Sequence, residues 1–183
     1  MRWDRLFDDL QAQLDAQGQR ELDLEVSDRT RRERAQVGLS ERLIAHRGLG
    51  VELHLAAGVQ LGGTVADVGS DWLLVQDRAE RGSLVPFGAI VWVNGLGVRA
   101  AAGPGVAMAK RFGLGFALRG LSRDRSAVSL ADIGGAVTTG TIDAVGADAL
   151  DLSEHPGDMA RRAENILARR VVPFTAIVVV RHR

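Results

Sequence analysis

One nine-residue phrase occurs twice in the chain, and this repetition constrains the fold more than any other feature. The phrase V-P-F-x-A-I-V-x-V occupies residues 85–93 and returns at residues 172–180, with seven of nine positions identical. Identity of this degree at a fixed separation of 87 residues indicates an internal duplication rather than chance. The sequence therefore predicts two similar structural units.

The repetition extends upstream of the phrase. Eleven positions between Val51 and Val75 carry identical or similar residues 77 positions later, between Val128 and Leu152. The two separations differ by ten residues, which places a ten-residue insertion within residues 154–169. Each unit thus starts near the first of these matches and ends with the phrase.

Short strands are predicted within each unit. Apolar Val51, Leu53 and Leu55 alternate with polar residues, which is the period of a β-strand. Turn-forming residues separate the further apolar runs, and Gly62-Gly63 suits a sharp bend. These further runs lie at residues 65–68, 72–76, 83–87 and 90–93. Five short strands in about 45 residues suit a small β-barrel.

Helices are predicted before and between the units. Steps of three and four residues place Trp3, Phe7 and Leu10 on one face of a first helix, and a second helix is expected from about residue 28 to residue 46. Between the units, a glycine-rich stretch precedes residues 106–123, which favour one helix or two short ones.

We therefore predict an α+β fold, in which N-terminal helices are followed by two tandem five-stranded β-barrels joined by a helical linker. The predicted parts are an N-terminal helical region (1–47), a first small barrel (48–95), a Gly-rich and helical linker (96–126) and a second small barrel with the insertion (127–183). Barrels of this size bury a modest share of their surface, so we expect them to pack on each other or on the helices.

The order of the motifs resembles the Sm-like branch of the SH3-like small barrels. In this chain the order is V-x-L-x-L, a glycine turn, G-T-V, G-x-D, L-x-V and the nine-residue phrase, and both copies show it. The similarity covers about half of the chain, whose arrangement also looks like a family of uncharacterised proteins of high-GC bacteria. The resemblance implies ring formation and RNA binding.

The residues that would carry RNA binding in that family are replaced here. Its Asp-x-hydrophobic-Asn set corresponds to residues 69–72 and 146–149, neither of which contains asparagine. Its basic pair before the last strand corresponds to Pro-Phe in both copies of the phrase. We therefore expect the fold of the family without its RNA-binding activity.

The composition excludes several classes of protein. The 183 residues contain no cysteine, which rules out disulfide scaffolds and thiolate metal sites. Acidic residues among the first twenty positions are incompatible with a secretory signal, and the longest apolar run, residues 171–180, is too short to cross a bilayer as a helix. We expect a cytoplasmic protein with no membrane partner.

No motif predicts catalysis, a cofactor or a bound metal. Residues 95–100 spell G-x-G-x-x-A, but Pro104 follows and no parallel βαβ pattern surrounds the motif, so we interpret it as linker. Asp71 and Asp148 recur beside glycine, where a carboxylate can hold a turn by accepting from a backbone N–H. The histidines lack the spacing of a metal site: His46, His54, His155 and His182.

The two units differ most at outward strand positions, where the first unit is more apolar. Trp72, Leu74 and Trp92 correspond to Ala149, Asp151 and Val179. Apolar patches of this kind mark buried or binding surfaces, so we expect them to meet the N-terminal helices, the other unit or another chain. The candidate protein interface comprises Trp3, Phe7, Leu10, Trp72, Leu74 and Trp92.

Arginines are concentrated near the C-terminus. These candidate nucleic-acid contacts are Arg161, Arg162, Arg169, Arg170, Arg181 and Arg183. They could bind phosphates in a salt-dependent manner, form a solvated face, or meet an acidic protein surface such as that of the first helix. Phe174 is the only aromatic residue nearby, which leaves base stacking without a platform.

These observations favour a non-catalytic binding or assembly (adaptor) protein that associates with itself or with a protein partner. The alternative is an RNA- or DNA-binding regulator that uses the C-terminal arginines. An enzyme is not expected, because no residue pattern supports a reaction.

Overall fold

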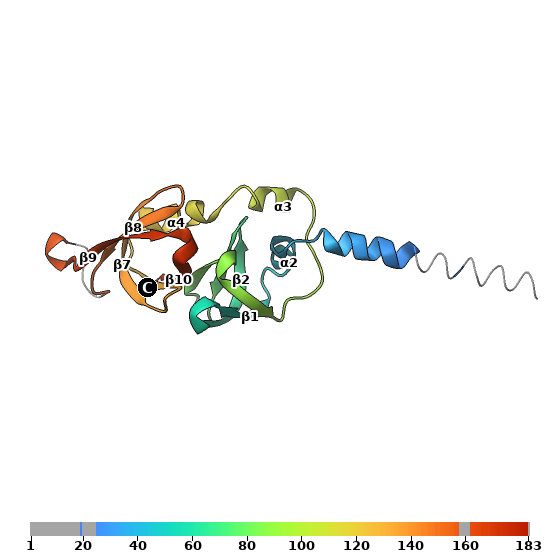
Figure 1. The fold of residues 1–183 in the computed structure, drawn as a ribbon, viewed down its shortest axis with the longest axis horizontal. Coiled ribbons are helices and arrows are strands. Elements are labelled where there is room, and N and C mark those ends of the chain that lie inside the picture. Colours follow the sequence, from blue (N-terminus) through green and yellow to red (C-terminus); the bar gives the residue numbers. More distant parts are fainter. Residues whose placement is uncertain (1–18, 20–24, 158–161, 183) are drawn as a thin grey trace, which may run out of the picture. The chain divides into compact units, whose positions relative to one another are not determined.

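The structure is a computed structural model that describes residue 19 and residues 25–157 and 162–182 (Figure 1). The chain divides into two compact units, Met1–Gly38 and Leu39–Arg183, and each is described by itself.

In the first unit, residues 25–35 form an exposed helix, on which Arg29 pairs with Glu33 one turn later (Nε–Oε1 3.2 Å). The prediction of one helix over residues 28–46 is wrong, because residues 36–38 are not helical. Val37 and Gly38 interrupt it, since β-branched residues and glycine have low helix propensity. The second unit begins with a separate helix, α2 (Leu39–Ala45).

The second unit is built mainly from ten strands. The first half of this unit holds β1 (Gly50–Leu55), β2 (Gln60–Val68), β3 (Trp72–Gln76), β4 (Gly82–Pro86) and β5 (Ile90–Asn94). The second half holds β6 (Val128–Asp132), β7 (Val137–Val145), β8 (Ala149–Glu154), β9 (Ala168–Pro173) and β10 (Ile177–His182). Between the halves lie α3 (Pro104–Ala109) and α4 (Leu114–Asp124).

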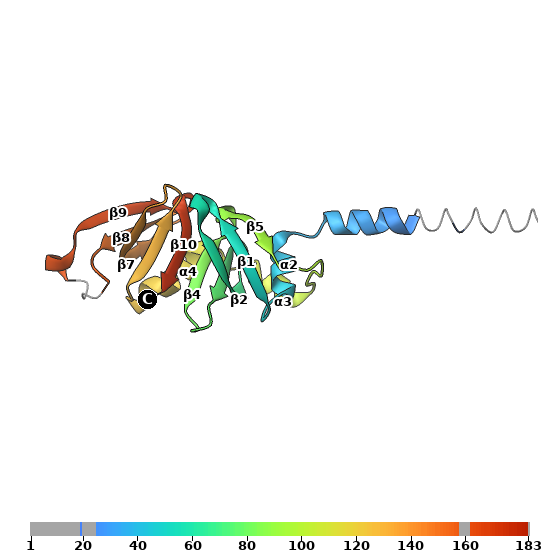
Figure 2. The same ribbon diagram turned by 90° about the horizontal axis from the view of Figure 1, so that it is seen from below.

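All ten strands belong to one sheet in the order β5-β1-β2-β3-β4-β10-β6-β7-β8-β9, with antiparallel neighbours throughout. The prediction of two tandem five-stranded barrels is therefore wrong: the sheet is open, and β5 and β9 are its ends. The reason is the pairing of β4 with β10, which places Leu84 opposite Val180 and Ser83 opposite Arg181. This internal joint, visible in Figure 2, merges the halves into a single sheet.

Both copies of the nine-residue phrase adopt the same conformation. Each ends a strand at proline (β4 or β9), makes one 3-10 turn and starts the next strand at isoleucine (β5 or β10). The phenylalanine N–H of each turn donates to the carbonyl of an aspartate, Asp71 (2.8 Å) or Asp148 (2.7 Å). The phrase is thus a strand-turn-strand connection.

Gly63, where the sequence predicts a bend in the second strand, lies at a close approach of two strands. A Cβ on Gly63 of β2 would lie 2.3 Å from the carbonyl oxygen of Gln76 in β3. At the corresponding place in β7, a Cβ on Gly140 would lie 2.2 Å from the carbonyl oxygen of Ser153. Both halves therefore require glycine where two strands approach closely.

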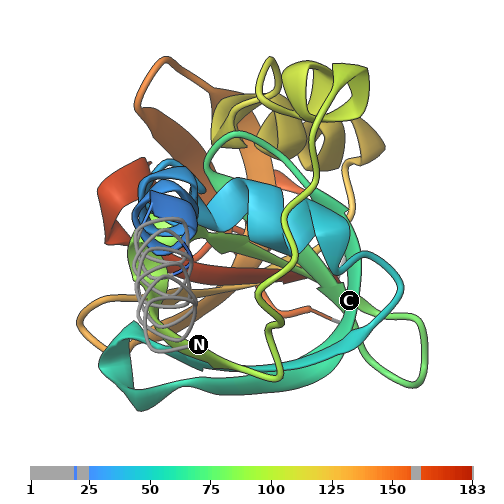
Figure 3. The ribbon, with the colours of Figure 1, turned by 90° about the vertical axis from the view of Figure 1, so that its right-hand side faces the viewer.

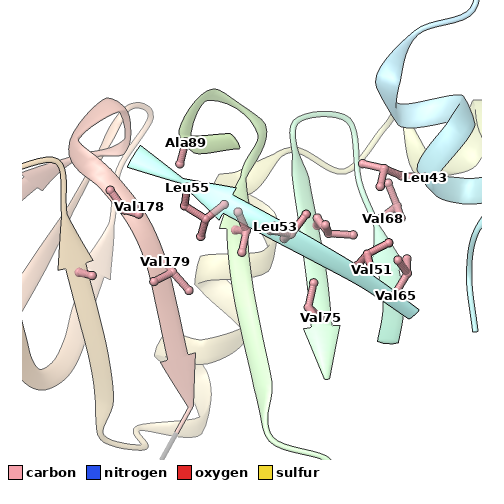
Figure 4. Close-up of a cluster of buried hydrophobic side chains, with 13 residues drawn as sticks. Leu43, Val51, Leu53, Leu55, Val65, Val68, Val75, Ala89, Val178 and Val179 are labelled. Atoms are coloured by element: carbon pink, nitrogen blue, oxygen red, sulfur yellow. The ribbon is translucent and has the colours of Figure 1, made fainter. Parts of the chain in front are cut away.

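The buried core continues across the internal joint. Val178 and Val179 of β10 lie in the cluster of the first half, beside Leu55 and Ala89 (Figure 4). Conversely, Leu84 of β4 belongs to the cluster of the second half. Because each half contributes side chains to the other's core, the halves should unfold together.

The linker is fastened to the second unit at several points. The Arg42 guanidinium on α2 donates to the carbonyls of Leu96 (3.2 Å) and Gly97 (3.0 Å). Figure 3 shows the linker crossing α2 on its way to the helices that follow. Further on, Lys110 forms an ion pair with Glu41, and Ser122 Oγ of α4 donates to the carbonyl of Ile142 in β7 (3.1 Å). These contacts hold the linker against both halves.

Among the described residues, no helix combines the length and apolar character needed to cross a membrane.

Shared burial predicts opposite outcomes for one substitution made in the two copies. Val178 is fully buried, so Val178→Ala should lower the free energy of unfolding by about 1–3 kcal/mol, because it leaves a cavity in the core. Its counterpart Val91 is 61% exposed, so Val91→Ala should change that free energy by less than about 0.5 kcal/mol. Urea denaturation of dilute protein measures both. A single transition for the strands is expected, and two separated transitions would contradict a shared core.

The ion pair at the linker predicts a pH dependence. The hydrogen bond from Lys110 lowers the pKa of Glu41 from 4.5 to about 2, so its stabilisation is present above pH 4.5 and is lost as the pH falls towards 2. Glu41→Gln should cost about 1 kcal/mol at pH 7, because half of the Lys110 side chain is in water, where the pair is screened. Urea denaturation should show this difference shrinking below pH 4.5. An equal difference at pH 7 and pH 2.5, or the same loss for exposed Glu52→Gln, would contradict the assignment.

Candidate protein interface

The predicted apolar interface residues lie at two separate places. Trp72 on β3 is buried in the core of the second half, where its indole Nε1 donates to the carbonyl of Phe112 (2.9 Å). Leu74 packs against the same cluster and is half-buried. Trp92 lies on β5, is 47% exposed and stacks on His54, with ring centroids 4.8 Å apart. The structure thus does not gather these three side chains into one patch, and Trp3, Phe7 and Leu10 lie outside the described residues.

The β5 edge, residues Ile90–Asn94, forms one end of the sheet. Its strand neighbour is β1, where Leu53 lies opposite Val93 and Glu52 opposite Asn94. In the described part of the chain, no strand lies on its other side. The exposed side chains of Val91 and Trp92 accompany this unpaired backbone.

The β9 edge, residues Ala168–Pro173, forms the opposite end. It pairs with β8 on one side, with Leu152 opposite Arg170 and Asp151 opposite Val171. The side chain of Val171 is 71% exposed. Arg169 and Arg170 beside it are charged and exposed, as is common at sheet edges that avoid indiscriminate pairing.

The internal joint buries the counterparts of both edges. Val178 and Val179 of β10 are fully buried, whereas the matching Val91 and Trp92 of β5 are exposed. Leu84 of β4 is 4% exposed, whereas the matching Val171 of β9 is open to solvent. The side chains of β4 and β10 are therefore buried where these strands pair, and the matching side chains of β9 and β5 are exposed at the two ends of the sheet.

The predicted nucleic-acid contacts are dispersed. Arg162 lies near Glu164 (3.9 Å), and Arg170 forms an ion pair with Glu154 (2.7 Å). Arg181 lies on β10, inside the sheet, opposite Ser83 and Ser129. Arg161 and Arg183 lie outside the described residues.

Two of these arginines line a pocket at the β9 edge. Arg169 and Arg170 surround a space of about 440 Å³ together with Arg125 and two carboxylates, Asp143 and Asp151. The carboxylates offset part of the positive charge that a phosphate would require. The pocket is therefore a mixed-charge surface rather than a cluster of cations.

Two further hollows are present. The larger one, about 930 Å³, lies beside the β3–β4 loop and is lined by backbone-exposing glycines and by the ion pair of Arg81 with Asp77 (2.7 Å). The hydrogen bond from Arg81 lowers the pKa of Asp77. An apolar hollow of about 430 Å³ lies between Trp72 and the linker residues Met108, Phe112 and Phe116.

Two of the candidate histidines, His46 and His155, accept or donate structural hydrogen bonds. Buried His155 bonds to Thr141 Oγ1 (2.8 Å) and to the carbonyl of Pro156 (2.8 Å), and His46 bonds to the carbonyl of Gly50 (3.1 Å). Within the described ranges, no three histidine or carboxylate side chains converge as a metal site would require. Two carbonyls of the G-x-G-x-x-A segment, those of Leu96 and Gly97, accept hydrogen bonds from Arg42.

Sequence reasoning missed one role of Asp71. Its carboxylate accepts from the N–H of Leu114 (2.7 Å), the first residue of α4, 43 residues away. Asp71 therefore ties a turn of the first half to the helix that packs on the second half. A turn-forming G-x-D motif alone does not distinguish Asp71 from its counterpart Asp148.

Comparison with known proteins gave no match among family models, curated proteins or solved structures. The resemblance to the Sm-like proteins therefore stays a prediction from the sequence.

Proposed function

We propose that this chain is a non-catalytic assembly protein that binds protein partners by strand addition at the two ends of its sheet. The observation that carries this proposal is the contrast between equivalent strands. β4 and β10 cover each other at the internal joint, whereas β9 and β5 expose the same positions.

An unpaired strand edge offers a row of backbone donors and acceptors to an extended segment of a partner. Exposed Val91, Trp92 and Val171 add apolar area beside these rows. Arg169 and Arg170 make unselective pairing unfavourable, so a partner must complement their charge. The β9 edge thus combines main-chain affinity with side-chain selectivity.

A peptide test addresses the β9 edge directly. The peptide Thr175–His182 contains β10, the strand that β4 binds, so a labelled copy should bind the full chain at β9. Val171→Asp should weaken this binding about tenfold or more, because pairing would bury an unpartnered carboxylate at a cost of about 1.4 kcal/mol or more. Fluorescence anisotropy of the peptide measures both affinities.

Val91→Asp is the matched control, since it introduces the same charge at the other edge and should not weaken peptide binding. A scrambled peptide should not bind. Absence of binding to the wild-type chain, or equal binding to Val171→Asp and wild type, would contradict strand addition at β9.

The second candidate function is nucleic-acid binding at β9, favoured by the adjacent positions of Arg125, Arg169 and Arg170 around one pocket. We rank it below strand addition because Asp143 and Asp151 share that pocket and Glu154 pairs with Arg170. A gel-shift titration at two salt concentrations separates the functions: tight, salt-sensitive binding would favour the nucleic-acid regulator.

A further inference from the structure

We infer that the partner at these edges is a second copy of this chain, joined head to tail, with the β9 edge of one copy paired to the β5 edge of the next. This inference rests on the proposed function and names its partner. The internal joint supplies the template, because it already pairs a β9-like strand, β4, with a β5-like strand, β10.

The template fixes the register between copies. Leu84 lies opposite Val180 and Ser83 opposite Arg181 at the internal joint. At the separation of 87 residues, Leu84 and Ser83 correspond to Val171 and Arg170 of β9, and Val180 and Arg181 correspond to Val93 and Asn94 of β5. Between two copies, Val171 should therefore lie opposite Val93, and Arg170 opposite Asn94.

This register extends an apolar row across the new joint. Inside the chain, Leu130, Val180 and Leu84 form a row across three strands, and each is buried. The corresponding row between copies is Leu53, Val93 and Val171 of the second copy. Leu53 is buried and Val93 is half-buried already, so pairing would chiefly cover Val171, which is now in water.

The neighbouring row provides charge complementarity. Glu52 of β1 lies opposite Asn94 of β5, and Asn94 would in turn lie opposite Arg170 of the second copy. Two strand spacings put the backbones of Glu52 and Arg170 about 10 Å apart on one face, which their two long side chains can bridge. The same row at the internal joint holds Ser129, Arg181 and Ser83 and contains no carboxylate.

The intermolecular joint should be weaker than the internal one. At the internal joint, Leu74 of β3 lies opposite Leu84 of β4 and continues the apolar row. At the β9 edge, Asp151 of β8 lies opposite Val171, so the apolar row ends one residue earlier. Each copy offers one edge of each kind, and such head-to-tail contacts build rings or open filaments rather than closed two-fold dimers. A weaker joint makes this assembly reversible.

Cysteine pairing tests both the partner and the register, because the natural chain contains no cysteine. Four single variants are made in the full chain: Val93→Cys, Asn94→Cys, Arg170→Cys and Val171→Cys. Directly opposite side chains lie close enough for a disulfide. Under mild oxidation, a mixture of Val93→Cys with Val171→Cys, or of Asn94→Cys with Arg170→Cys, should therefore give a covalent dimer in denaturing electrophoresis.

The recombined mixtures are the matched control. Mixing Val93→Cys with Arg170→Cys, or Asn94→Cys with Val171→Cys, uses the same substitutions but places the sulfurs on opposite faces of the sheet, so dimers should be at least about tenfold less abundant. Equal yields from all mixtures, or dimers from a single variant alone, would overturn the head-to-tail register. Absence of any dimer while the peptide still binds at β9 would overturn self-pairing and leave strand addition to another protein.

Discussion

The pairing of β4 with β10 is the interaction on which the rest of the second unit depends. It is short, since two residue pairs define it, yet it lets Val178 and Val179 enter the core of the first half and Leu84 enter that of the second. Neither half could keep these side chains buried alone. The linker reinforces the joint, because Asp71 binds the start of α4 and α4 packs on β7.

Much of this fold follows from the sequence. The strands, the need for glycine at Gly63 and Gly140 and the strand-turn-strand role of the phrase come from local patterns whose cause is steric or periodic. The pairing of β4 with β10 does not follow from the sequence, because Leu84 and Val180 are 96 residues apart. The alternation of apolar and polar residues shows which face of a strand is buried, but not which strand lies beside it. Two barrels and one continuous sheet share the same local signals, so the predicted architecture was wrong.

The candidate interface was predictable only in part. Comparison of the copies drew attention to Trp72 and Trp92, yet the structure buries the first against the linker and leaves the second at a sheet edge. The more informative difference lies within the repeated phrase itself, where Val91 is exposed and its identical counterpart Val178 is buried. Identical residues cannot reveal that their surroundings differ. This difference arises from the order of strands in the sheet: β10 pairs with β4, whereas β5 has no strand beyond it in the described chain.

The central feature of this structure is an open sheet whose end strands, β9 and β5, correspond to the two strands that pair inside it, β4 and β10. Sedimentation equilibrium of the full-length wild-type chain over a range of concentrations tests it most directly. We expect a weight-average mass that exceeds the 19.6 kDa of one chain and rises with concentration, and a return to 19.6 kDa when Val171 is replaced by aspartate. A wild-type mass of 19.6 kDa at every concentration would contradict it.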